Sequence, residues 1–194
     1  GDNKKIKKDL DLLISQSSRC NEILKKLSLN PIIEDEFIDS NASLYDYISE
    51  IVISFQEISE KKFAINLKQF QNRINIYKST EIIYGLRNFI GNANKFGNEK
   101  IEIFLKSNNK NTEIIIRDDG PGFPKDLIDK HRLGEPYIRT ADEAHISKYG
   151  LGLGTFIGKT LLEKNFANII FKNSNITGGA EIIIQWNNKD LINV

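Results

Sequence analysis

The sequence has only one cysteine and almost no imbalance of charge. Its 194 residues include 27 Lys and Arg against 26 Asp and Glu. A lone thiol, Cys20, can neither close an internal disulfide nor supply a zinc cluster, which fits a reducing, cytoplasmic setting. The balanced charge gives no basic tail or surface, so we expect no direct nucleic-acid partner.

Long hydrophobic runs are also missing. The apolar runs, such as residues 114–116 and 182–184, fall far short of the ~20 residues that a membrane helix needs. We therefore expect no membrane span and no signal peptide in this sequence. A chain of this length with 40% apolar residues is nevertheless long enough to bury a sizeable core.

Residues 1–30 are predicted to form one long helix, which ends at Pro31. Its apolar and small residues recur at alternating spacings of four and three, at Ile6, Leu10, Leu13, Ser17, Cys20, Leu24 and Leu27. One helix cannot bury such a seam alone, so it packs either on the rest of the chain or on a second chain. Residues 31–43, which contain Pro31 and several acids, are predicted to be a linker.

Residues 44–194 predict an α+β domain. Ser43 is suited to cap a helix that starts at Leu44, and further helices are expected at 80–96, after Pro124 and after Gly154. Because the strands come in groups instead of alternating strictly with helices, we predict a mixed sheet covered by helices on one face. The strands are expected near 63–67, 74–76, 101–105, 114–116, 168–172 and 181–186, with the third and fourth paired as an antiparallel hairpin.

Seven of the 13 glycines lie in three clusters, DDGPG, YGLGLG and TGGA. The GLGLG run precedes an amphipathic stretch at 155–162, so its backbone amides would lie at a helix N-terminus, a position that favours phosphate. A plain loop is the alternative. A dinucleotide fingerprint would need glycine at Thr155 or Ile157, and a Walker motif would need one at Leu153, so both are excluded.

The predicted helix at 80–96 carries two amides and a cation on one face. Asn88 and Asn92 are four residues apart, and Lys95 follows three residues later. Amide oxygens suit a hard Mg²⁺ ion that is shared with phosphates, and Lys95 can meet phosphate charge. Each asparagine taken alone is more typical of a solvated surface.

Asp118 begins the DDGPG segment, directly after an isoleucine-rich strand. Asp-Gly sequences at this place are common in tight turns, which is one interpretation. A carboxylate fixed at a strand end can also accept a hydrogen bond from an exocyclic amine, and it would then favour adenine over guanine.

Five segments together resemble the ATP-binding catalytic domain of sensor histidine kinases, within the wider family that includes gyrase and Hsp90. NFIGNANKF, RDDGPGF, LGEPY, YGLGLG and NITGGAEIII are similar, in this order, to its N, G1, F, G2 and G3 boxes. The match covers residues 44–187. It implies a Bergerat-type ATP-binding sandwich with ATP and Mg²⁺ as cofactors.

The resemblance also implies roles for residues at matching positions. Asn92 would coordinate Mg²⁺ with help from Asn88, and Lys95 would touch phosphate. Asn88 and Lys95 would thus be the catalytic residues, and Asp118 would bind the adenine amine. The other ATP-binding residues would be Phe96, Gly120, Gly122, Tyr137, Gly150, Leu151, Gly152, Leu153 and Gly154.

Residues 138–149 would form the ATP lid of such a domain. Their polar, mixed-charge sequence suits a segment that orders on nucleotide. Arg139 and Lys148 would be able to close on the phosphates. An ordinary solvated loop charge is the alternative for each of them.

The chain departs from the family pattern in two ways. Ala180 stands where many relatives have threonine. The only histidines, His131 and His145, lie between the G1 and G2 boxes, so the phosphoacceptor histidine is expected on a helix that precedes this sequence. ATP hydrolases of the superfamily activate water with a glutamate where this chain has Asn88, so slow hydrolysis is expected.

A narrower resemblance, to the RegB/PrrB redox-responsive kinases, rests on SRCNEILKKLS, GEPYIRT and KTLLEK. It implies that residues 1–30 are the second helix of a dimerisation hairpin, and that the protein is a homodimer which passes phosphate to a response regulator. The membrane would be reached only through upstream segments. Cys20 would then form a redox-sensitive disulfide between two chains, with Arg19 favouring its thiolate. From its place in the seam alone, we expect Cys20 to be a small buried core residue, and the disulfide is the alternative that the resemblance adds.

The expected function is that of the ATP- and Mg²⁺-binding catalytic domain of a two-component sensor histidine kinase. Such a domain positions the γ-phosphoryl group for a histidine outside this sequence. The alternative is a nucleotide-binding module without kinase activity, which signals by conformation and docks a partner protein through the first helix.

Overall fold

The computed structural model describes residues 42–70, 79–135 and 153–192, all within the unit Ser40–Val194. The predicted helix at 1–30, residues 31–41 of the predicted linker and the predicted strand at 74–76 lie outside these residues. The elements in chain order are α2 (Leu44–Gln56), β1 (Lys62–Phe70), α3 (Thr80–Phe96), β2 (Lys100–Ser107), β3 (Asn111–Asp118), α4 (Lys125–Asp129), α5 (Leu153–Lys164), β4 (Asn168–Asn173), β5 (Ala180–Asn187) and α6 (Asn188–Ile192).

The five strands in the described ranges form one mixed sheet in the order β1-β2-β3-β5-β4. β1 and β2 are parallel, which requires a crossover between them, and α3 lies in that crossover. The other neighbouring pairs are antiparallel. β2 and β3 form the predicted hairpin, and the Asn108 side chain closes its turn by accepting hydrogen bonds from the amides of Lys110 (2.8 Å) and Asn111 (2.9 Å).

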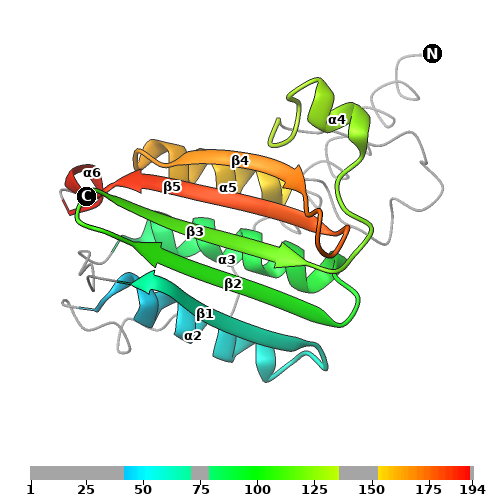
Figure 1. The fold of residues 1–194 in the computed structure, drawn as a ribbon, viewed down its shortest axis with the longest axis horizontal. Helices are drawn as coiled ribbons and strands as arrows, with labels where there is room; N and C mark the ends of the chain where they lie inside the picture. Colours follow the sequence, from blue (N-terminus) through cyan, green and yellow to red (C-terminus); the bar gives the residue numbers. More distant parts are fainter. Residues whose placement is uncertain (1–41, 71–78, 136–152, 193–194) are drawn as a thin grey trace, which may run out of the picture. The chain divides into compact units, whose positions relative to one another are not determined.

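Helices α2, α3 and α5 lie together on one face of the sheet, which confirms the predicted layout (Figure 1). Ser43 caps α2 through a capping box with Asp46, as the sequence predicts for that cap. Every second strand residue faces the helices. The core on this face includes the buried residues Ile101, Ile103, Leu105, Ile114, Ile116, Ile182 and Ile184.

Two helices differ from the prediction. α5 begins at Leu153 and not after Gly154. Gly154 therefore belongs to the first turn of this helix, where it lies against the Asn92 side chain. α6 was missed because five residues are too few to show a helical period. Asn188 anchors its start by accepting from the Thr112 hydroxyl (2.8 Å) and donating to the Asn108 carbonyl (2.6 Å). None of the helices in the described ranges is long and apolar enough to cross a membrane.

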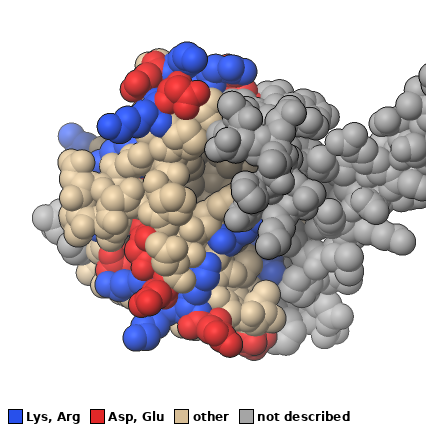
Figure 2. Space-filling model, turned by 90° about the vertical axis from the view of Figure 1, so that its right-hand side faces the viewer, with Lys and Arg blue, Asp and Glu red and all other residues tan. Residues whose placement is uncertain are grey.

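One end of the sheet gathers the segments that carry the predicted site. β3 ends there at Asp118, β5 begins at Ala180, α3 ends at Phe96 and α5 begins at Leu153. Figure 2 views this end and shows a hollowed, largely uncharged surface between two groups of charged residues.

Candidate functional site

The side-chain amides of Asn88 and Asn92 of α3 both lie against Gly154 of α5. A Cβ atom placed on Gly154 would lie 3.2 Å from Oδ1 of Asn92 and 3.6 Å from Oδ1 of Asn88. Asn92 also donates a hydrogen bond to the Thr155 hydroxyl (3.2 Å), and Asn88 donates one to the Tyr84 carbonyl (2.8 Å). The two amides therefore share one helix face, as the spacing predicts. Their oxygens are of the kind that hard cations such as Mg²⁺ bind.

Lys95 and Phe96 lie in the last turn of α3, one turn beyond Asn92. Both side chains are exposed, and Nζ of Lys95 lies 5.2 Å from the centre of the Phe96 ring. This distance is within the range of a cation–π interaction. α3 therefore ends in a cation and an aromatic ring at the site end of the sheet.

Asp118 is buried at the end of β3, with 4% of the residue exposed. Its Oδ1 accepts hydrogen bonds from the backbone amides of Gly120 (2.9 Å) and Ala180 (3.1 Å). Burial raises the pKa of Asp118 above its ordinary value, although these amides and the charge of Lys61 oppose the rise; the nearby Asp119 adds to it. The structure thus holds the Asp118 carboxylate in a fixed position at the end of the strand. The same residue begins a tight turn, which was the other interpretation of this segment.

Asp119 has a structural role that the sequence analysis missed. Its carboxylate accepts hydrogen bonds from the backbone amides of Asn98 (2.8 Å), Glu99 (3.1 Å) and Lys100 (3.1 Å). Burial tends to raise the pKa of Asp119, but the hydrogen bonds outweigh burial and hold the pKa below its ordinary value. Asp119 therefore fixes the turn between α3 and β2 against the end of β3.

Lys61 is a second residue that the sequence analysis did not single out. Its Nζ donates to the carbonyl oxygens of Gly97 (2.6 Å) and Asn94 at the C-terminal end of α3. A positive charge at this end of a helix is favourable because the unpaired carbonyls carry partial negative charge. Lys61 therefore holds the end of the helix that carries Lys95 and Phe96.

Gly120 and Gly122 follow Asp118 in the loop after β3, and the backbone requires glycine at both. A Cβ atom on Gly120 would collide with the carbonyl oxygen of Phe96. Gly122 has a φ of 77°, in the left-handed region that glycine adopts without strain. The loop therefore passes close to the end of α3.

The end of β4 and the turn that follows it hold this loop from the other side. The Thr177 hydroxyl donates to the carbonyl oxygen of Asp118 (2.7 Å). The Asn173 side chain forms two hydrogen bonds with the backbone of Phe123, of 2.6 and 2.9 Å. Neither residue was predicted, because their partners lie 50 or more positions away along the chain.

Several predicted site residues lie outside the described part of the chain. These are Tyr137, Gly150, Leu151, Gly152, the lid at 138–149 with Arg139 and Lys148, and Cys20 in the first helix. Leu153 is described only as the first residue of α5.

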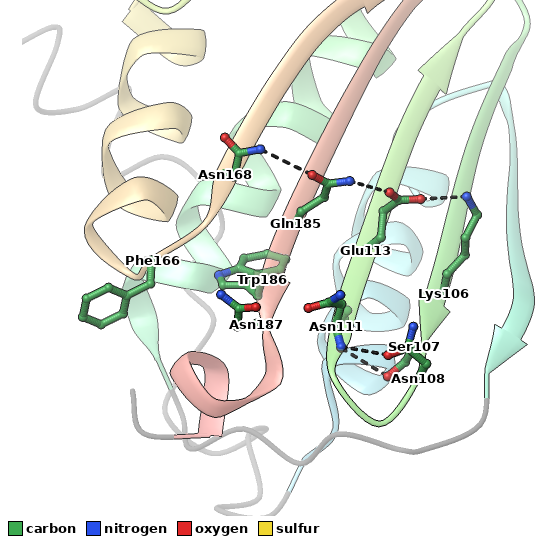
Figure 3. Close-up of a pocket in the computed structure, with 11 residues that line it drawn as sticks. Lys106, Ser107, Asn108, Asn111, Glu113, Phe166, Asn168, Gln185, Trp186 and Asn187 are labelled. Carbon is green, nitrogen blue, oxygen red and sulfur yellow. Dashed lines mark hydrogen bonds and ion pairs between the residues drawn. The ribbon is translucent and has the colours of Figure 1, made fainter.

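A pocket of about 690 Å³ lies at the opposite end of the sheet, and none of the predicted site residues that the structure describes lines it. Figure 3 shows a row of polar side chains across four strands in this pocket, formed by Lys106, Glu113, Gln185 and Asn168. Because these groups bond to one another, we assign the row to the stability of the sheet and not to a ligand.

Residues 78–190 match the family of histidine kinase-, DNA gyrase B- and HSP90-like ATPases. The match covers more than half of the chain, and the chain therefore belongs to this family. Its fold is that of the ATP-binding domain that the sequence predicts.

Among curated proteins, the chain is similar to the sensor histidine kinase RegB of Cereibacter sphaeroides. The two are 30% identical over 177 residues, which is 87% of this chain and 37% of RegB. The sensor protein kinase PilS of Pseudomonas aeruginosa is 23% identical over 178 residues, 87% of this chain and 32% of PilS. The predicted resemblance to RegB is confirmed, and the chain spans about a third of the length of these relatives.

Solved structures share the fold. The mycobacterial sensor histidine kinase MprB superposes with a TM-score of 0.62 and 18% identity, over 77% of this chain and 97% of that one. The catalytic domain of histidine kinase ThkA gives a TM-score of 0.61 and 22% identity, over 75% of this chain and 95% of that one. The α+β fold predicted from the sequence is therefore the fold of histidine kinase catalytic domains.

Proposed function

We propose that the chain binds ATP together with Mg²⁺ and positions the γ-phosphoryl group for transfer to a histidine outside this sequence. It would act as the catalytic domain of a two-component sensor histidine kinase. The observation that carries the proposal is that the side-chain amides of Asn88 and Asn92 both lie against Gly154 in the first turn of α5, at the same end of the sheet as the buried Asp118 carboxylate.

The Asp118 carboxylate supports recognition of adenine. The 6-amino group of adenine donates a hydrogen bond, whereas guanine presents a carbonyl oxygen at that position, which a carboxylate repels. Two backbone amides occupy Oδ1, and none of the described residues donates to Oδ2. That oxygen is therefore available to an amine, and the adjoining loop has no side chain at Gly120 or Gly122.

The helix face of Asn88 and Asn92 supports Mg²⁺ binding. Mg²⁺ bound to ATP bridges phosphate oxygens and neutralises their charge. Asn92 would be the ligand of the ion and Asn88 its support. Lys95 and the amides at the start of α5, including that of Gly154, would meet the phosphates. Tyr137, the lid at 138–149 and residues 150–152 would complete the ATP site.

Asn88 also bears on the fate of the γ-phosphoryl group. An amide cannot accept a proton at neutral pH, so Asn88 cannot activate a water molecule as a glutamate would. Hydrolysis would then be slow, and bound ATP would remain available to an external imidazole. Positioning and charge compensation supply catalysis of this kind.

The partners belong to the same proposal. Residues 1–30 would dimerise the protein, which would pass its phosphoryl group to a response regulator. The chain would form the cytoplasmic part of a sensor that reaches the membrane through upstream segments. Cys20 would respond to oxidation by linking two chains. Similarity to proteins named as sensor kinases supports this reading.

Calorimetric titration of ATP, ADP and GTP, with and without Mg²⁺, tests the proposal. The wild type should bind adenine nucleotides in the micromolar range and prefer them to GTP. Asp118→Ala should lose that binding, and Asn92→Ala should lose its dependence on Mg²⁺. Phosphotransfer is tested by adding a separate histidine-bearing helical fragment from a sensor kinase with labelled ATP.

The outcomes separate the two candidate functions. ATP binding with phosphotransfer supports the kinase. Binding without transfer to any histidine-bearing fragment would favour the nucleotide-binding module that docks a partner. A folded chain that binds no nucleotide would overturn both.

A further inference from the structure

Asn173, the last residue of β4, holds the backbone of Phe123 with both ends of its amide. Oδ1 accepts a hydrogen bond from the Phe123 amide (2.6 Å), and Nδ2 donates one to the Phe123 carbonyl (2.9 Å). β4 is an edge strand of the sheet. The side chain therefore pairs with Phe123 as the backbone of a neighbouring strand would.

Phe123 ends the loop that starts at Asp118, and this loop rests on Asn173. A Cβ atom on Gly122 would lie only 2.7 Å from Oδ1 of Asn173. At the start of the loop, the Thr177 hydroxyl donates to the Asp118 carbonyl (2.7 Å). Asn173 and Thr177 thus fix the two ends of the loop.

Packed aromatic rings connect the same loop to α3. The Phe123 ring meets that of Phe171 edge-on, with 5.7 Å between their centres, and Phe171 meets Phe89 edge-on at 5.9 Å. Phe89 is fully buried in α3, next to Asn88. These two ring contacts link Phe123 to the core of the domain.

We propose that Asn173 is a positioning residue for the nucleotide, which sets loop 120–123 relative to Asp118 before any ligand binds. This inference rests on the proposed ATP site. Without these two hydrogen bonds the loop has to be ordered during binding, and the entropy lost in ordering it weakens the affinity. The Asn173 amide bonds to the loop after Asp118 and not to the described residues that would hold the ion, so the dependence on Mg²⁺ should not change.

Asparagine suits this position because an amide offers one donor and one acceptor side by side. Asn173→Asp keeps an acceptor for the Phe123 amide but turns a second oxygen toward the Phe123 carbonyl. Asn173→Ala removes both bonds. Asn168→Ala is the matched control, because Asn168 is the same residue type at the other end of β4, where it donates to Gln185.

Titration of ADP into the full chain, with and without Mg²⁺, measures the effect on binding. We expect affinity about tenfold weaker in Asn173→Ala, which is the usual scale for two lost hydrogen bonds that order a loop. Asn173→Asp should be at least as weak, and Asn168→Ala should equal the wild type. The ratio of affinities with and without Mg²⁺ should be the same in all four proteins.

Hydrogen exchange of the ligand-free chain tests the clamp without nucleotide. The Phe123 amide should exchange about tenfold faster in Asn173→Ala and at the wild-type rate in Asn168→Ala. Thermal unfolding identifies a variant that fails to fold, in which case Asn173→Asp provides the test. Unchanged ADP affinity, or unchanged exchange at Phe123, in a folded variant would overturn the inference. A wild-type chain that binds no ADP would instead overturn the proposed function, and this inference with it.

Discussion

The backbone amide of Ala180 donates a 3.1 Å hydrogen bond to Oδ1 of Asp118, and so joins the start of β5 to the end of β3. Ala180 makes this contact through its backbone and not through its side chain. No replacement of its side chain other than by proline removes that donor. The carboxylate is thus held in place where burial raises its pKa.

The affinity for ADP should fall on acidification because of Asp118. Its raised pKa means that the carboxylate takes up a proton at a pH above the ordinary value of 3.8, and a protonated Oδ2 no longer accepts from the adenine amine. Calorimetry from neutral to mildly acidic pH should show affinity declining before that value is reached. The ionisation of ADP itself affects the wild type and Asp118→Asn alike. The amide of the variant does not titrate, so Asp118→Asn should lack the additional decline in affinity. Identical pH profiles would argue against contact between Asp118 and adenine.

Asp119→Ala should destabilise the fold by about 1–2 kcal/mol. Three backbone amides in the turn between α3 and β2 lose their acceptor, and water replaces it only in part. Urea unfolding measures the loss. The control is Asp129→Ala at the exposed end of α4, which should leave the unfolding free energy nearly unchanged. Equal stability of the two variants would contradict the role given to Asp119.

Glu181 should make stability depend on acid pH. Burial tends to raise its pKa, but hydrogen bonds from Lys172 and Arg117 outweigh burial and hold the pKa below the ordinary value of 4.5. A lowered pKa in the folded state means that the ionised form stabilises the fold. This contribution is fully present above pH 4.5 and disappears as the pH falls through the folded-state pKa.

Urea unfolding over a pH series should therefore show the free energy of unfolding of the wild type declining below pH 4.5. Glu181→Gln should be less stable at neutral pH and decline less steeply. If both proteins show the same slope, the ion pairs of Glu181 with Arg117 and Lys172 do not stabilise the folded state.

Asn88→Glu should increase ATP hydrolysis. The new carboxylate can accept a proton from water beside the amide of Asn92, which Asn88 cannot do. We expect release of inorganic phosphate to rise about tenfold or more, since a well-placed general base contributes at least that much. Asn88→Gln, which introduces a side chain of the same length without the charge, should hydrolyse as slowly as the wild type. Equal rates in the wild type and in an Asn88→Glu variant that still binds ATP would show that water is not accessible there.

Phe166→Gly should stabilise the protein by about 0.5–1 kcal/mol. Phe166 follows α5 with a φ of 63°, while 66% of the residue is exposed. Glycine adopts this left-handed conformation without strain. The exposed Phe166 ring buries little apolar surface, so its burial does not offset the strain in the backbone. Urea unfolding measures the gain. Phe166→Ala, which loses the ring but keeps the strained backbone, should show no gain in the free energy of unfolding. An equal gain in Phe166→Gly and Phe166→Ala would assign the effect to the exposed ring.

The sequence was sufficient where a local rule decides the structure. Ser43 caps α2 because its hydroxyl and the Asp46 carboxylate satisfy backbone amides three residues apart. Asn88 and Asn92 share a face of α3 because four residues make about one helical turn. The hairpin between β2 and β3 follows from two alternating runs around a polar turn.

The remaining features depend on contacts between distant parts of the chain. Asp119 acts on Asn98 and its neighbours, and Asn173 acts on a residue 50 positions away. Nothing in the local sequence distinguishes these side chains from ordinary turn residues, because their roles exist only after the sheet has formed. Lys61, which joins the end of α3, is equally invisible to periodicity and composition.

The side-chain amides of Asn88 and Asn92 lie against Gly154, and the start of β5 holds the Asp118 carboxylate at the end of β3. The candidate site therefore draws on four elements from across the domain, α3, α5, β3 and β5. No short stretch of the unfolded chain could reproduce it. Nucleotide should therefore bind the native state alone, and at one hundred times its Kd it would add about 2.7 kcal/mol to the free energy of unfolding. Occupancy of the site would then regulate how often the whole domain opens, and with it the resistance of the protein to proteases.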